Sequence, residues 1–348
     1  MLAGALFVSG CAGPAAPPGE PEVKGSHSVY SLPISKRGFY LGIVATPKNS
    51  PMSSFEDLAA AYEEAGRIAE VAMVWVEAQG IGEHEALKRN RLIEGLRVHG
   101  LRTFITLNFA TIKKAEGGLE YVVDAPEGTP ANLSDPAFRE RWMAEARELA
   151  RDFRPEYISL GNEINDYFYL HPEELDAYVS LFDETKREIK KVSPETKVLV
   201  VFSYNHLLEN EQWELLETFD SRADVIGITT YPWKQYGAPE DMPDDYYSRI
   251  AMHTTRPIAF TEIGWISDPP SSEKRQSQFL LRFLELTKDL DVEMVNWLFL
   301  HEMELGGVAG EVSDPRTGSI ALKRRDGSEK DVYLLWLDLK DLPLEDKG

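Results

Sequence analysis

Residues 157–165 read YISLGNEIN, an apolar run that ends abruptly in Gly-Asn-Glu. Side chains alternate between two faces along a strand, so Glu163 shares a face with Ser159, while Ile158 and Leu160 point to the other face. Small or polar residues on one face and branched residues on the other are typical of a strand that lines a closed barrel and is covered by helices. The stretch therefore predicts a barrel strand that ends in a carboxylate.

Seven further segments are similar to this strand in length and composition, and stretches with helical periodicity separate them. The eight predicted strands are 39–45, 71–77, 102–108, 157–163, 197–203, 224–231, 257–262 and 292–299. The predicted helices are 53–66, 84–99, 134–153, 172–191, 271–290 and 331–342, with weaker patterns at 209–219 and 241–254. The first helix is expected to begin with a capping box formed by Ser53 and Glu56.

Eight strands alternating with helices predict an α/β fold in which residues 36–348 form one (β/α)8 TIM barrel, a single catalytic domain. An open parallel sheet is the alternative. No GxGxxG or GxxxxGK[ST] motif follows any predicted strand, which disfavours the nucleotide-binding forms of such a sheet. The closed barrel is therefore the preferred prediction.

Composition limits the possible partners. The 348 residues carry a formal net charge of -21, which repels phosphate backbones, so we expect no nucleic-acid partner. The seven histidines form neither an HxH pair nor an HExxH motif, so we expect no transition-metal site and no cofactor, with calcium bound by carboxylates as the remaining alternative. These observations disfavour a metal-dependent barrel hydrolase and favour a neutral ligand for a chain that we expect to be a monomer.

The N-terminus has the features of an export signal. Residues 1–10 are small and apolar, too few to span a bilayer, and they precede the single cysteine, Cys11. The sequence Val-Ser-Gly-Cys that ends at Cys11 resembles a bacterial lipobox, which implies a signal segment over 1–11 and a lipidated cysteine. Residues 12–35, rich in Pro, Gly and Ala in their first part, predict a flexible tether. We therefore expect an exported, cell-envelope lipoprotein or a secreted protein that meets the membrane only through this anchor; a functionless apolar tail is the alternative.

Polar and aromatic residues gather where the predicted strands end, the place where barrel enzymes hold their active sites. These residues are Glu77, Asn108, Asn162, Glu163, Asn205, Tyr231, Trp233, Glu262, Trp265, Trp297 and His301. Glu163 ends the fourth strand and Glu262 ends the seventh, 99 residues later (262 − 163), which corresponds to three βα units of about 33 residues. Both carboxylates can therefore point into one cleft.

The motifs GNE at the end of strand four and TEIGW (261–265) at the end of strand seven resemble those of glycoside hydrolase clan A. Members of that clan are (β/α)8 barrels that cleave β-linked sugars with retention. The resemblance implies that Glu163 is the general acid/base and Glu262 the nucleophile. It also implies that Asn162 binds the sugar 2-hydroxyl, that Tyr231 holds the nucleophile, and that Trp297 is a platform for a sugar ring.

The resemblance extends over roughly residues 37–340. Retention needs two carboxyl groups about 5–5.5 Å apart, one charged and one protonated. A hydroxyl donor beside Glu262 would favour the charge there and leave the proton on Glu163. Trp233 and Trp265 offer flat apolar faces for sugar rings, or are core residues under the loops.

Other residues of the set have two possible roles. Glu77 and Asn108 could bind sugar hydroxyls or pair with basic residues at the barrel mouth. Asn205 is assigned to substrate binding, and His301 either to a substrate subsite or to a structural hydrogen bond. The retaining hydrolysis of a β-linked oligosaccharide or polysaccharide is the predicted function, and a catalytically silent glycan-binding barrel at the cell surface is the alternative.

The substrate stays open because the motifs match no single family. Ile164 follows Glu163, where cellulase-like members have proline. TEIGW is similar to the nucleophile motif of β-1,3-glucanases. GNEI, which contains Glu163, is similar to a motif of β-1,4-galactanases. The long segment 109–133 after the third strand is expected to be a loop that shapes the cleft.

Overall fold

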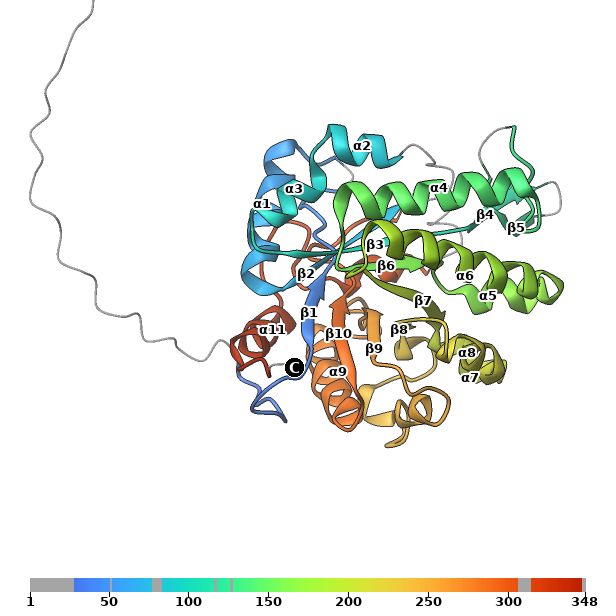
Figure 1. Cartoon of the computed structure of the whole chain (residues 1–348). Coiled ribbons are helices and arrows are strands. Elements are labelled where there is room, and N and C mark those ends of the chain that lie inside the picture. Colours follow the sequence, from blue (N-terminus) through green and yellow to red (C-terminus); the bar gives the residue numbers. More distant parts are fainter. Residues whose placement is uncertain are drawn as a thin grey trace, which may run out of the picture.

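Eight parallel strands close into a barrel at the centre of the computed structural model, and helices surround it (Figure 1). The barrel strands are β1 (Tyr40–Ile43), β2 (Val71–Val76), β3 (Arg102–Leu107), β6 (Tyr157–Leu160), β7 (Lys197–Ser203), β8 (Val225–Thr230), β9 (Ile258–Ile263) and β10 (Val292–Trp297). The structure describes residues 28–50, 52–76, 83–115, 118–125, 128–305 and 314–345.

The order of the strands around the barrel is β1-β10-β9-β8-β7-β6-β3-β2. β1 closes the ring because it pairs in parallel with both β10 and β2, for example Tyr40 with Met294 and Gly42 with Val71. A Cβ on Gly42 would lie 2.5 Å from Oδ1 of Asn296, its partner on β10, so glycine is required at this position. The predicted single (β/α)8 barrel is confirmed, with β6 as its fourth strand and β9 as its seventh.

The helices lie outside the barrel, and their apolar faces cover the outward side chains of the strands. They are α1 (Phe55–Ile68), α2 (Glu83–Arg89), α3 (Leu92–Arg97), α4 (Pro136–Phe153), α5 (Ile164–Leu170), α6 (Leu175–Val192), α7 (Tyr204–Glu209), α8 (Trp213–Asp220), α9 (Glu273–Thr287) and α11 (Asp331–Asp341). Within the part of the chain that the structure describes, no helix is long and apolar enough to cross a bilayer.

Two helix predictions were wrong in detail. The predicted helix over 84–99 divides into α2 and α3, because Arg91 has a left-handed backbone (φ 54°) that a continuous helix cannot contain. Only a 3₁₀ turn at Ser248–Met252 forms within the weak pattern at 241–254. Both errors concern surface segments away from the strand ends.

The cap of α1 lies one residue later than predicted. Ser54 accepts a hydrogen bond from the backbone N–H of Asp57 at 3.1 Å, and the Asp57 carboxylate accepts one from the N–H of Ser54 at 2.9 Å. Ser53, the predicted cap, donates its hydroxyl to the Lys48 carbonyl at 2.8 Å instead. The capping box therefore exists, with a different pair of residues.

The predicted loop over 109–133 contains an antiparallel ribbon, β4 (Ala110–Ala115) and β5 (Gly118–Val123), which projects beside α4 and α5 (Figure 1). His171, at the end of α5, contacts the carbonyl of Tyr121 through Nε2 at 2.9 Å. The ribbon is therefore fixed to the helix that follows Glu163.

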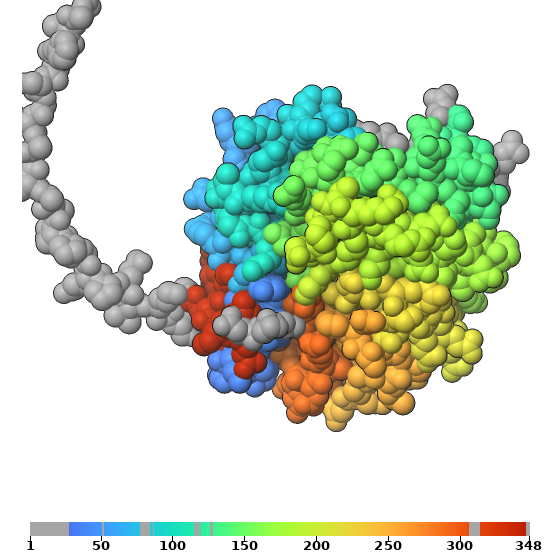
Figure 2. Space-filling view, in the orientation of Figure 1, coloured from blue at the N-terminus to red at the C-terminus, as the bar shows by residue number. Residues whose placement is uncertain are grey.

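The two ends of the described chain meet at the base of the barrel, where the strands begin. The N–H of Arg37 donates to the carbonyl of Pro343 at 3.0 Å, and the N–H of Glu345 donates to the carbonyl of Arg37 at 2.9 Å. Figure 2 shows the red C-terminal helix packed beside the blue N-terminal segment. Both termini therefore leave from the end of the barrel opposite to the carboxyl ends of the strands.

Candidate active site

The turn after β6 has an unusual backbone that aims Glu163. Gly161 has φ 121° and Glu163 has φ 50°, both in the left-handed half of the Ramachandran map. A non-glycine residue adopts this conformation at a cost of about 1–3 kcal/mol and keeps it only where its surroundings hold it. Here Asn108, at the end of β3, accepts the backbone N–H of Asn162 at 3.0 Å. Asn108 thus positions the turn, and its predicted contact with substrate stays a prediction.

Glu163 and Glu262 lie near enough for their charges to interact, and each accepts hydrogen bonds from its own donors. Glu262, only 7% exposed, accepts hydrogen bonds from the Tyr231 hydroxyl and, at 3.3 Å, from the Asn162 amide. Glu163 accepts one from the Thr229 hydroxyl at 2.5 Å. Thr229 on β8 is paired with Glu262 on β9, so the donor to Glu163 lies beside Glu262.

The electrostatics of the pair favour one shared negative charge. Burial, followed by the charge of Glu163, raises the pKa of Glu262, against the lowering effect of the Tyr231 and Asn162 hydrogen bonds. Burial also raises the pKa of Glu163. Each carboxyl resists ionisation while the other is charged, so the pair keeps one proton near neutral pH. Glu262 receives two hydrogen bonds and Glu163 one, which favours the charge on Glu262.

Asn205 positions Tyr231 and does not face a substrate. It is buried, its Oδ1 accepts the Tyr231 N–H at 3.0 Å, and its Nδ2 donates to the Tyr231 carbonyl at 3.3 Å. Both polar atoms of the amide are used by one backbone, so the predicted assignment of Asn205 to substrate binding is wrong. The amide instead fixes the residue whose hydroxyl reaches Glu262.

Trp297 cannot serve as the predicted sugar platform. Its side chain is fully buried, its Nε1 donates to the Ile320 carbonyl at 2.8 Å, and its ring packs against Trp336 of α11 and Phe279 of α9. Asn296, one residue earlier, faces the interior, so alternation turns Trp297 outward beneath the helices. The prediction for Trp297 is therefore wrong.

Trp265 is a core residue as well. Its side chain is 1% exposed, Nε1 donates to the Ser271 hydroxyl at 3.0 Å, and the ring packs on Phe279. The alternative given for it, packing under the loops, is the one found. Trp233 differs, because it directly follows the Tyr231-Pro232 turn and its buried Nε1 has no hydrogen-bond partner among the described residues. It is the tryptophan that stays a candidate for sugar contact.

His301 makes a structural link, the second of its two predicted roles. It is 5% exposed, its Nδ1 lies 2.8 Å from the carbonyl of Thr46, and its N–H donates to the Thr46 hydroxyl at 3.0 Å. Burial lowers the pKa of its imidazole. It therefore joins the segments that follow β10 and β1. Glu77 and Cys11 lie outside the described residues.

Sequence reasoning missed Thr229, Asp166, His206 and Lys234. Asp166, one turn after Glu163 on α5, pairs with Nδ1 of His206 at 2.6 Å, and its charge adds to burial in raising the pKa of Glu163. The nearby ammonium of Lys234 lowers the pKa of both glutamates. Spacing could have revealed Asp166, three residues after Glu163, and Thr229, two before Tyr231. The other two lie on α7 and on the 3₁₀ turn Pro232–Lys234, and gave no local signal.

No described residues at this mouth form a group with the geometry of a metal site; the group that has it is His84, Glu145 and Glu148, on α2 and α4. A separate cavity of about 570 Å³ opens at the base of the barrel, between the first residues of several strands, including Tyr40, Tyr157 and Glu293. That cavity lies away from the Glu163–Glu262 pair, and the arrangement of charge and hydrogen bonds makes the mouth the candidate active site.

Comparison with known proteins supports the fold. No family model and no curated protein sequence matches the chain. An exo-β-1,4-mannosidase, Op5Man5 from Opitutaceae bacterium strain TAV5, superposes with a TM-score of 0.67 over 91% of this chain at 14% identity. The chain spans 61% of that protein. The present chain has the barrel fold that glycoside hydrolases also have.

Two further structures agree. The GH5_18 protein from Streptomyces cattleya, solved with GlcNAc, has a TM-score of 0.65 and 15% identity over 90% of this chain and 83% of its own. A family 39 glycoside hydrolase from Bacteroides cellulosilyticus WH2 has a TM-score of 0.59 and 14% identity over 87% of this chain and 63% of its own. At these identities the similarity establishes the fold, and the chemistry has to be argued from the site.

Proposed function

We propose that the protein is a retaining glycoside hydrolase, with Glu262 as nucleophile and Glu163 as acid/base. One observation carries the proposal: Glu262, which is buried, and Glu163, which is half-buried, share the barrel mouth, and two hydrogen-bond donors, Tyr231 and Asn162, converge on Glu262. Two carboxylic groups of unequal protonation are the requirement of this chemistry. Glycoside hydrolases share this barrel fold, which supports a glycosidase at the level of the fold.

The reaction would proceed in two displacements. In the first, a carboxylate oxygen of Glu262 attacks the anomeric carbon, the glycosidic bond breaks, and Glu163 gives its proton to the leaving oxygen. In the second, Glu163 takes a proton from water, the water oxygen attacks the same carbon, and the ester to Glu262 breaks. The sugar leaves with its original anomeric configuration and both glutamates return to their starting states.

Neighbouring residues would assign the proton to Glu163. The Tyr231 and Asn162 hydrogen bonds stabilise a charged Glu262, whereas the carboxylate of Asp166 disfavours a charged Glu163. After the first displacement the Glu262 charge is lost in the ester, and the pKa of Glu163 should fall. That change lets Glu163 act next as a base.

Two buried polar atoms fit contacts with a sugar. Oδ1 of Asn162 and Nε1 of Trp233 have no hydrogen-bond partner among the described residues, and an unsatisfied buried group costs about 1–3 kcal/mol. A sugar 2-hydroxyl could donate to Oδ1 of Asn162. Another oxygen of the same sugar could accept a hydrogen bond from Nε1 of Trp233. The substrate class is a β-linked oligosaccharide or polysaccharide.

The first experiment is a panel of β-linked substrates. It should begin with β-mannosides and β-glucosides, because a mannosidase and a β-glucosidase share the fold. Glu262→Gln and Glu163→Gln should abolish turnover of the best substrate while circular dichroism stays unchanged. Glu173→Gln, at a 69% exposed side chain, is the matched control and should keep full activity.

A second experiment identifies the nucleophile. Glu262→Ala with azide should regain turnover and release a glycosyl azide of inverted configuration, because azide fills the space of the carboxylate. Substrate binding without turnover in the unaltered chain would leave the alternative of a silent glycan-binding barrel. Full activity in Glu262→Gln would refute Glu262 as the nucleophile.

The proposed anchor is independent of this chemistry. We propose that Cys11 is lipidated and that residues 1–11 are an export signal, followed by a tether over 12–35. A Cys11→Ser variant expressed from the full gene should move from the membrane fraction to the soluble fraction. Unchanged partitioning would refute Cys11 as the anchor.

A further inference from the structure

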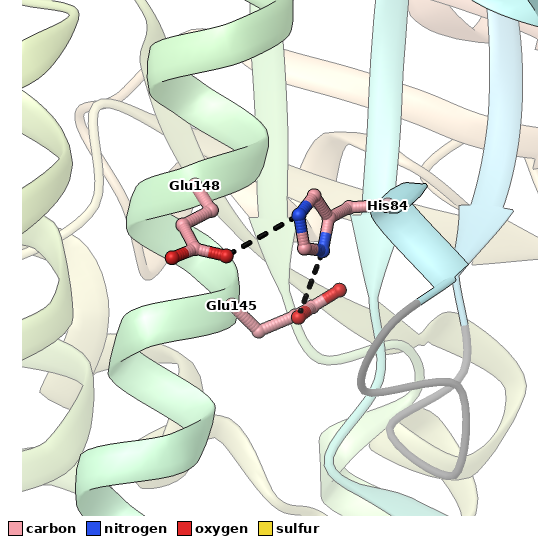
Figure 3. A group of neighbouring side chains, drawn as sticks. All are labelled: His84, Glu145 and Glu148. Atoms are coloured by element: carbon pink, nitrogen blue, oxygen red, sulfur yellow. Dashed lines mark ion pairs between the residues drawn. The ribbon is translucent and has the colours of Figure 1, made fainter. Parts of the chain in front are cut away.

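A second cluster of ionisable side chains lies between α2 and α4, away from the barrel mouth (Figure 3). His84 comes from α2, whereas Glu145 and Glu148 lie three residues apart on α4 and therefore on one face of that helix. Figure 3 shows the imidazole between the two carboxylates, with one ring nitrogen toward each. The catalytic proposal uses none of these residues.

The distances suit coordination of a metal ion. His84 Nε2 lies 3.3 Å from Glu148 Oε2, and Nδ1 lies 3.3 Å from Glu145 Oε2. One ligand atom from each of the three residues lies within 4.8 Å of the other two. Two ligands about 2.0–2.1 Å from a tetrahedral zinc ion lie about 3.4 Å apart. One ion takes one ring nitrogen, so one of the two observed separations applies to it, and the third ligand atom lies within 4.8 Å of the others.

Burial suits a cation at this cluster. His84 is 8% exposed, Glu145 is 3% exposed, and Nδ1 of His84 has no hydrogen bond of acceptable geometry. The side chain of Glu148 is 32% exposed, and that of Glu85, whose carboxylate lies 3.1 Å from Nε2, is 62% exposed, so water screens both of these charges. A divalent ion bound by the imidazole would balance the charge of the carboxylates that bind it.

We propose that His84, Glu145 and Glu148 form a binding site for one divalent transition-metal ion. One imidazole and two carboxylates make a mixed nitrogen and oxygen ligand set, which suits Zn²⁺ or Mn²⁺ better than the oxygen-seeking Ca²⁺ and Mg²⁺. The ion would join α2, which follows β2, to α4, which precedes the strand that carries the Glu163 turn. Its role is structural.

Isothermal titration of the full, chelator-treated chain tests the site directly. Zn²⁺ should bind in a 1:1 ratio with a dissociation constant in the micromolar range or tighter, and Ca²⁺ and Mg²⁺ at least about tenfold more weakly. His84→Gln and Glu148→Gln should each weaken Zn²⁺ binding about 10- to 100-fold or more, since even outer-shell changes have effects of that size. His253→Gln, which alters an imidazole paired with the single carboxylate of Glu217, is the matched control and should bind as the unaltered chain does.

Two other readouts keep the test decisive if a variant folds poorly. Saturating Zn²⁺ should raise the melting temperature of the unaltered chain by a few degrees, because the ion binds the folded state. Co²⁺ should give visible absorption bands of a four-coordinate site, which excess Zn²⁺ removes. Zn²⁺ binding weaker than about 1 mM, or tight binding that survives both His84→Gln and Glu148→Gln, would overturn the proposal.

Discussion

Removal of the Tyr231 hydroxyl should weaken catalysis and shift its pH dependence. In Tyr231→Phe, Glu262 loses one of its two hydrogen bonds, and the ring stays in place because Asn205 holds the backbone. A hydrogen bond to a charged group contributes about 1.5–3 kcal/mol, and each 1.36 kcal/mol corresponds to about a tenfold change in rate. We therefore expect kcat/KM to fall about 10- to 150-fold.

The pH profile gives the more specific readout. The Tyr231 hydrogen bond lowers the pKa of Glu262, so its removal raises that pKa by about 1–2 units. Turnover requires a charged Glu262, and activity should then be lost at a higher pH on the acidic side. The basic side, set by the proton on Glu163, should move less, and the pH range of activity should narrow.

Tyr247→Phe is the matched control. Tyr247 is fully buried near the same strand, and its hydroxyl contacts Thr230 at 3.0 Å without touching either glutamate. This variant should keep the pH profile of the unaltered enzyme. An equal shift in both variants, or a Tyr231→Phe enzyme within about threefold of full activity, would refute the assignment of Glu262 as a nucleophile held by Tyr231.

Three further changes separate structure from catalysis. Gly161→Ala should lower the free energy of unfolding by more than about 1 kcal/mol and also lower kcat, because φ is 121° and the new Cβ would meet a side-chain carbon at 2.6 Å. Thermal melts measure the first effect and kinetics the second. An unaltered melting temperature would contradict the expected strain. Trp297→Phe should cost about 1–3 kcal/mol of stability through lost packing and the bond to Ile320, with KM unchanged; a large rise in KM at constant stability would restore Trp297 as a sugar platform. Burial raises the pKa of Glu70, but hydrogen bonds, first from Arg37, outweigh burial and hold that pKa below 4.5. The Glu70 carboxylate therefore stabilises the fold above about pH 4.5, and this stabilisation is lost as the pH falls through the pKa of Glu70 in the folded protein. Glu70→Gln should therefore destabilise the protein at pH 7 and have a diminishing effect in acid, as denaturant titrations at several pH values would show.

The topology and the positions of the two glutamates could be predicted because they depend on periodic patterns. The regular βα repeat placed Glu262 three units after Glu163. A closed barrel brings the carboxyl ends of all its strands to one mouth, so knowledge of the strand ends was sufficient. Alternation along 157–163 was not what directs Glu163, because β6 ends at Leu160 and a left-handed turn aims that side chain. The contact of Tyr231 with Glu262 was implied by the resemblance to clan A.

The tryptophans show the limit of that reasoning. Being near a strand end does not decide which face a residue occupies, and the β9–β10 register shifts between Val295 and Trp297. Trp297 therefore lies outward under α9 and α11, a result that depends on helices distant in sequence. Apolar surface drives an indole into whichever site buries it best, and composition alone does not identify that site.

Residues that serve the backbone were also hidden from sequence reasoning. Asn205 was expected to face a ligand, and Asn108 to bind sugar hydroxyls or pair with a basic residue. Each hydrogen-bonds the backbone of another segment, 54 residues away for Asn108 and 26 for Asn205, a role that was not predicted for either. Such contacts satisfy buried peptide groups in irregular turns, and they depend on loop geometry that periodicity does not encode.

The meeting of the first and last described segments at Arg37 and Glu345 places both at the end of the barrel opposite Glu163 and Glu262. A rigid support joined to either segment would therefore contact the molecule at its base. The mouth would be on the far side from that support, which makes Arg37 and Glu345 useful neighbours for sites that fix the protein to a bead or a sensor surface.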